Sequence, residues 1–112
     1  MRDDQYIKLA VRAAASGPDR VFRLGAVAVR ADGALVRAHN SRSTQPTPRA
    51  HAESRIMNRC DVGAVVYVAR VRADGSTALA KPCPACRLKM ISRGVKKCVY
   101  TVDSLTHATE IY

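Results

Sequence analysis

The stretch AVVYVARVR, residues Ala64–Arg72, is almost continuously apolar. A strand with one solvated face shows alternating apolar and polar residues, whereas a run of this kind is expected for a central strand covered on both faces. Such a strand needs a layer of helices on each side of its sheet. The stretch therefore predicts a three-layer α/β arrangement, and the flanking segments have to supply the helices.

Helices are expected directly before and after this strand. Thr47-Pro48 is typical of a helix cap followed by proline at the first helical position, and this helix is expected to run to about Cys60. Asp74-Gly75 predicts a turn after the strand. Cys83-Pro84 begins the next helix, again with proline at its first position, and Gly94 ends it.

The N-terminal part of the chain predicts one more helix and a hairpin. Asp3-Asp4 suits the positive end of a helix, and apolar residues recur at helical spacing until Ser16-Gly17-Pro18 stops it. Val21–Arg30 is strand-like. Asp32-Gly33 signals a tight turn, after which Ala34–Ala38 is expected to return antiparallel.

The C-terminal part predicts a fourth strand over Lys97–Val102. A parallel fifth strand would need a crossover of about a dozen residues or more, and only residues 103–112 follow. Any fifth strand in Thr106–Tyr112 must therefore return as a hairpin. The fold class that we predict is a three-layer α/β/α sandwich around a mixed sheet of four to five strands, whose last strand is short and antiparallel if it is present.

Length and composition favour one globular domain over residues 1–112, with 47% apolar residues. No apolar run approaches the roughly 20 residues that cross a membrane, and the N-terminus lacks the apolar segment of a signal peptide. We therefore expect no membrane partner and a cytoplasmic location, where thiols stay reduced and can bind metal. The net charge of +10 would attract anionic partners, or it simply gives a well-solvated surface.

Two short motifs carry candidate chemistry: His51-Ala52-Glu53, and Pro82-Cys83-Pro84-Ala85-Cys86. One histidine and two cysteines can hold a zinc ion and leave its fourth position open for water. Each motif alone is weak, because a Cys-x-x-Cys pair also occurs in structural zinc sites and in redox pairs. Together, each at an expected helix start, they favour a catalytic zinc site. Cys60 and Cys98 are expected to be core residues.

The combined pattern resembles the cytidine/deoxycytidylate deaminase superfamily of zinc-dependent nucleobase deaminases, over about Gly25 to Val102. The resemblance implies one zinc ion per chain, held by His51, Cys83 and Cys86. It also implies that Glu53 is the catalytic residue, which carries a proton from the attacking water to the ring and then to the departing amino group. A short antiparallel last strand resembles the cytidine deaminase branch.

The same resemblance implies further substrate contacts. Asn40 stands where these families hold the sugar, and Ala52 stands where their backbone contacts the base. Gly25-Ala26 resembles the strand segment that packs against the ring, although a steric need for glycine explains it nearly as well. Phe22 could stack on a base or belong to the core. Arg23 could bind a phosphate or be an ordinary surface arginine.

The sequence leaves the substrate open between two main alternatives. The first is the cytosine of a free nucleoside or nucleotide (cytidine, deoxycytidine or dCMP), which is converted to the uracil product with release of ammonia. The second is cytosine in single-stranded DNA or RNA, which the positive charge favours but the scarcity of aromatic residues does not. A zinc-stabilised binding module without activity is disfavoured by the presence of Glu53. A homo-oligomer is possible.

Overall fold

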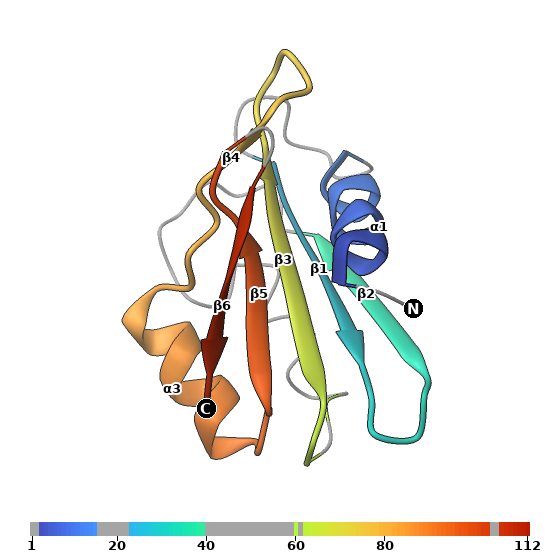
Figure 1. Ribbon diagram of the computed structural model, residues 1–112, viewed down its shortest axis with the longest axis vertical. Helices are drawn as coiled ribbons and strands as arrows, with labels where there is room; N and C mark the ends of the chain where they lie inside the picture. Colours follow the sequence, from blue (N-terminus) through green and yellow to red (C-terminus); the bar gives the residue numbers. More distant parts are fainter. Residues whose placement is uncertain (1–2, 16–22, 40–59, 61, 104–105) are drawn as a thin grey trace.

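The computed structural model describes residues 3–15, 23–39, 60, 62–103 and 106–112, and Figure 1 shows their arrangement. The helix that we expect between Pro48 and Cys60 lies outside the described residues, apart from Cys60 itself. In the described part, no helix is long and apolar enough to cross a membrane.

A mixed β-sheet forms the centre of the molecule, with the strand order β2-β1-β3-β5-β6 (Figure 1). Neighbouring strands are antiparallel, except for β3 and β5, which run parallel. The strands of this path are β1 (Arg23–Val29), β2 (Leu35–His39), β3 (Val65–Val71), β5 (Lys97–Thr101) and β6 (His107–Ile111). The predicted hairpin, the apolar central strand and the antiparallel last strand are therefore confirmed.

Strand β3 is covered on both faces, as its apolar sequence predicts. Val66 and Val68 belong to one buried cluster, which also contains Met90 of helix α3 (Pro84–Ser92). Tyr67 and Ala69 belong to a second cluster, which contains Ile7 and Ala10 of helix α1 (Asp3–Ala15). Because side chains alternate between the faces of a strand, α1 and α3 lie on opposite faces of the sheet, and the three-layer prediction is confirmed.

The sheet contains one strand more than the sequence predicts. Strand β4 (Thr77–Ala78) folds back from the turn after β3 and pairs antiparallel with it, in the register Arg70↔Ala78. The turn is closed by a backbone hydrogen bond from Arg72 N to Ser76 O of 2.8 Å, and the Asp74 carboxylate accepts the Ser76 N–H at 2.9 Å. A strand of two residues is too short to show any periodicity, which is why the sequence predicts the five strands of the main path and not this additional element.

Candidate metal centre

Two of the three predicted metal ligands lie together at the start of helix α3. Cys83 is the residue that precedes the helix, and Cys86 lies in its first turn. Their sulfur atoms are 3.3 Å apart, and neither cysteine is in a disulfide. Cys86 is 1% exposed, whereas Cys83 is partly exposed. The pair therefore lies at the boundary between the core and the surface.

The local sequence explains why both sulfurs lie at the helix start. Pro84 occupies the first turn, where its fixed φ suits the helix and its missing N–H costs no hydrogen bond. Cys83 has extended backbone angles, φ −67° and ψ 160°, and its side chain does not cap the helix. Its carbonyl oxygen accepts the Arg87 N–H at 2.9 Å. The backbone thus anchors this turn without using the thiol.

The geometry of the pair fits two ligands of one zinc ion. With zinc–sulfur bonds of about 2.3 Å, two ligands of a tetrahedral site have sulfurs roughly 3.8 Å apart. The observed 3.3 Å needs only a small separation of the side chains to reach this value. A third ligand is not among the described residues, which contain no cluster of three or more metal-ligating side chains.

Five other residues of the predicted site lie outside the described part of the chain. This holds for the predicted ligand His51, for Glu53 and Ala52 beside it, and for Asn40 and Phe22. The structure therefore brings Cys83 and Cys86 together and leaves the other five as predictions from the sequence.

The two other cysteines have the environment of core residues. Cys98 is fully buried in the cluster that packs against α3, and Cys60 is partly buried against the same cluster. Both match the expectation from the sequence. The two pairs of cysteines therefore have different environments. Cys83 and Cys86 lie at a helix start, whereas Cys60 and Cys98 lie against the apolar core.

Gly25 and Ala26 face opposite sides of the sheet. A Cβ atom on Gly25 would lie 2.2 Å from the Ala10 carbonyl oxygen and 2.3 Å from the Ala14 nitrogen, so this position admits no side chain beneath α1. Ala26 is fully buried in the cluster on the α3 side. The close approach of α1 is therefore the steric reason for a glycine at position 25. The Ala26 side chain points to the other face of the sheet, on which α3 and the two cysteines lie.

Arg23 is attached to the neighbouring strand. Its guanidinium donates a hydrogen bond of 2.5 Å from Nη2 to the carbonyl oxygen of Arg72, just beyond the end of β3. Its Nε is buried and has no hydrogen-bond partner among the described residues. The predicted phosphate contact at this residue stays a prediction.

An ion pair that the sequence did not indicate connects α3 to β6. Arg87 donates to both carboxylate oxygens of Glu110, at 3.0 and 2.8 Å, and Tyr112 donates to the same carboxylate at 2.9 Å. The hydrogen bond from Arg87 lowers the pKa of Glu110, more strongly than burial raises it. Because Arg87 directly follows Cys86, this pair holds the first turns of α3 against the edge of the sheet.

On the opposite face, a second polar cluster connects α1 to the sheet. The Tyr67 hydroxyl donates to the Asp3 carboxylate at 2.6 Å, and Lys97 donates to the same carboxylate at 3.3 Å. The hydrogen bond from Tyr67 lowers the pKa of Asp3. The pKa of Tyr67 is raised, mainly because the hydroxyl is buried and also because it bonds to the Asp3 carboxylate. These residues are far apart in the sequence, so no local pattern could have revealed the cluster.

The chain is similar to known proteins in sequence and in fold. Residues 1–102 match the family model described as the cytidine and deoxycytidylate deaminase zinc-binding region. No curated protein sequence matches the chain significantly.

Several solved structures share the fold at low sequence identity. A cytidine deaminase from Burkholderia pseudomallei has a TM-score of 0.73 and 20% identity, over 99% of this chain and 93% of that one. A cytidine deaminase from Mycobacterium tuberculosis has a TM-score of 0.63 and 22% identity, over 90% and 85% of the two chains. A dCMP deaminase from the cyanophage S-TIM5 has a TM-score of 0.62 and 22% identity, over 91% and 86%.

Proposed function

This chain belongs to the family defined by the cytidine and deoxycytidylate deaminase zinc-binding region, and from this premise we propose that it hydrolytically deaminates the cytosine of a free nucleoside or nucleotide. The product would be the corresponding uracil compound, released together with ammonia. The observation that carries the proposal is the pair of sulfurs, 3.3 Å apart at the start of α3, inside the matched region. The whole chain, residues 1–112, would act as one zinc-dependent deaminase domain.

His51, Cys83 and Cys86 would hold one zinc ion. Two cysteines and one histidine form a donor set typical of zinc, and three protein ligands leave a position for water. When bound, zinc would supply a water molecule acidified enough to ionise near neutral pH. The ion pair between Arg87 and Glu110 supports this assignment, because it fixes the helix turn that carries both sulfurs.

Glu53 would carry the protons of the reaction. Its carboxylate would take a proton from the attacking water and pass it to N3 of the ring as the water oxygen bonds to C4. It would then transfer the second proton to the amino group, which leaves as ammonia while the C4 carbonyl forms. A carboxylate held by the metal could not move between these positions, so Glu53 is proposed as a proton carrier and not as a ligand.

Substrate contacts would come from the segments around this centre. We propose that Asn40 holds the sugar and that the backbone at Ala52 and the side chain of Ala26 contact the base. Ala26 is supported by its place on the α3 side of the sheet. Gly25 would take part through its backbone. Stacking of Phe22 on the base and phosphate binding by Arg23 stay predictions from the sequence.

A free pyrimidine is favoured over a polymer by the relatives. The solved structures that share the fold include two cytidine deaminases and a dCMP deaminase, each matched over at least 90% of this chain. The single-stranded substrate, the cytoplasmic location and a homo-oligomeric state stay predictions from the sequence.

A substrate panel tests the proposal. Zinc-loaded protein is incubated with cytidine, deoxycytidine, dCMP and a cytosine-containing single-stranded oligonucleotide, and the products are identified by mass spectrometry. We expect conversion of at least one monomer with a mass increase of about one dalton, as NH₂ is replaced by OH, and no conversion of the oligonucleotide. Conversion of the oligonucleotide alone would overturn the proposed substrate class, and conversion of none would overturn the proposed activity.

A further inference from the structure

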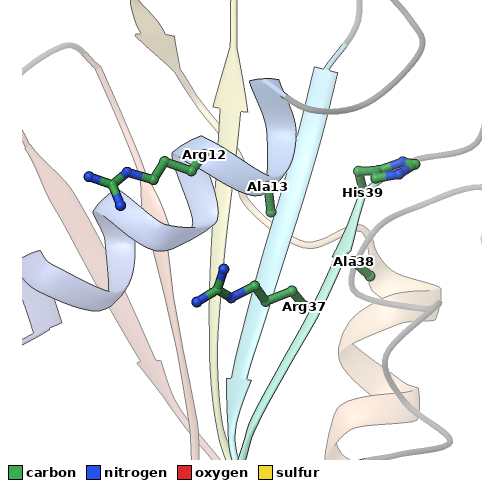
Figure 2. A pocket seen from close by; sticks show the side chains of 5 residues that line it. All are labelled: Arg12, Ala13, Arg37, Ala38 and His39. Atoms are coloured by element: carbon green, nitrogen blue, oxygen red, sulfur yellow. The ribbon is translucent and has the colours of Figure 1, made fainter.

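An open cleft lies between helix α1 and the edge strand β2, and Figure 2 shows the five residues that line it. Its volume is about 240 Å³. Arg12 and Ala13 come from α1, whereas Arg37, Ala38 and His39 come from β2. In Figure 2 the two arginine side chains reach in the same direction from the two elements. The cleft thus combines two guanidinium groups and an imidazole.

The cleft is separate from the candidate metal centre. Arg37 pairs in register with Val27, which belongs to the buried cluster beneath α1. Ala26 and Ala28, the neighbours of Val27, belong instead to the cluster on the α3 side, where Cys83 and Cys86 lie. Because side chains alternate along a strand, the Arg37 side chain is on the opposite face of the sheet from the two cysteines.

No described carboxylate neutralises the positive charge of this cleft. The lining contains no acidic residue among the described ones, and no ion pair of Arg12 or Arg37 with another described residue is found. The described ion pairs lie elsewhere in the molecule and involve Arg30 with Asp32, Arg87 with Glu110, and Lys97 with Asp3. Two guanidinium groups beside one cavity whose described lining holds no carboxylate are suited to an external anion.

The chemistry of the lining favours phosphate over a smaller or singly charged anion. A guanidinium group presents planar pairs of N–H donors that match the oxygens of a phosphate, and two such groups can balance a doubly charged monoester. The open cleft, with a volume of about 240 Å³, is large enough to admit a phosphate group.

We propose that the cleft between α1 and β2 is a phosphate-binding site, in which Arg12 and Arg37 bind the phosphate oxygens. This proposal does not rest on deaminase activity, because the cleft and the cysteine pair lie on opposite faces of the sheet. The phosphate can come from inorganic phosphate or from the phosphomonoester of a nucleotide, and the two sources share the same chemistry.

The site can be tested by titrating ¹⁵N-labelled protein with inorganic phosphate and following amide chemical shifts. The ionic strength is kept at about 10 mM, where charges are little screened. We expect saturable shifts at the amides of Ala13 and Arg37, which line the cleft on the α1 face. Arg12→Gln and Arg37→Gln should each weaken binding about tenfold or more, because each removes charge-assisted hydrogen bonds, and the double variant should abolish it.

Lys8→Gln is the matched control. Lys8 lies one turn before Arg12 on α1 and lines a different cleft, together with Asp4 and Thr77. Its replacement by glutamine changes the net charge by the same amount as each arginine variant. If Lys8→Gln binds phosphate with an affinity within twofold of that of the unmodified protein, the result supports the site. Equal weakening by Lys8→Gln, equal shifts with chloride, or unchanged phosphate binding in the double variant would overturn it.

A second pair of titrations identifies the source of the phosphate. Deoxycytidine and dCMP differ only by the phosphate group, so a shift of Ala13 and Arg37 with dCMP alone supports a nucleotide phosphate at this cleft. Shifts with inorganic phosphate and not with dCMP support a site for the free anion. Shifts at these two amides with deoxycytidine that match those with dCMP would overturn a phosphate-directed site.

Discussion

The two faces of the sheet are held to their helices in different ways. Helix α1 packs on β1 and β3 through small buried residues, and Gly25 allows its backbone to approach β1 closely. Helix α3 contributes Met90 to the opposite core and carries the cysteine pair at its start. Apolar packing thus holds α1 to its face of the sheet, whereas the start of α3 is the part that a metal ion would stabilise.

Removal of the metal should give the largest effect, on the α3 face. Cys86→Ala is expected to abolish zinc binding and to lower the melting temperature, because a ligand that binds only the folded state stabilises it by about 4 kcal/mol at 1,000 times its dissociation constant. Metal analysis and thermal melting check this. In the unmodified protein, a chelator should increase hydrogen exchange in α3 and leave α1 unchanged.

Cys98→Ala is the matched control for this experiment. Cys98 is buried to the same degree as Cys86 but lies in the apolar core. The variant should therefore lose packing energy and keep its zinc. Zinc loss in Cys98→Ala with zinc retained in Cys86→Ala would contradict the assignment of the ligands.

A side chain at Gly25 should give the largest effect on the α1 face. Gly25→Ala places a Cβ within 2.2 Å of the Ala10 carbonyl oxygen, so the helix has to shift, at a cost of about 3 kcal/mol of unfolding free energy. Chemical denaturation measures the loss. Gly75→Ala is the comparison, because Gly75 has a φ of +90° and open space around it and should cost only about 1 kcal/mol. Equal costs at the two positions would contradict the close approach of α1.

The ion pair between α3 and β6 should give the smallest effect, because both side chains are partly exposed and water screens the pair. The pKa of Glu110 lies below its ordinary value of 4.5 in the folded protein. The folded state therefore binds this proton less readily than the unfolded chain does. The stabilisation is complete above about pH 4.5 and is lost as the pH falls toward the lowered pKa.

Glu110→Gln should reduce that part of the pH dependence and lower the melting temperature slightly near neutral pH. Melting curves between about pH 3 and pH 7 measure both effects. A variant that keeps the full loss of stability on acidification would show that other carboxylates, such as Asp3, account for it.

The sequence predicts this fold well where a pattern extends over several residues. The apolar run of Ala64–Arg72 identifies the central strand, and the predicted antiparallel last strand is observed as β6 beside β5. Strand β4 escapes prediction because two residues show no periodicity. The contacts of Arg87 with Glu110 and of Tyr67 with Asp3 escape it as well, since they join residues that only the folded chain brings together.

The candidate site was also predictable only where its residues form a local sequence pattern. The spacing of Cys83 and Cys86 is local, and the pair lies where the sequence places it, at a helix start. Gly25 is needed because the backbone of α1 packs directly against it. The sequence alone does not reveal which segment of the chain packs against a glycine in a strand. The cleft of Arg12 and Arg37 combines residues from a helix and a strand, each of which resembles an ordinary surface arginine in the sequence.

The most direct test of the account is a joint measurement of zinc content and cytosine deamination in Glu53→Ala, beside the unmodified protein. The account predicts about one zinc per chain in both proteins and turnover in the unmodified protein alone, because Glu53 carries protons and does not bind the metal. Loss of zinc from the variant would make Glu53 a ligand. Undiminished turnover with zinc retained would contradict the proposed chemistry.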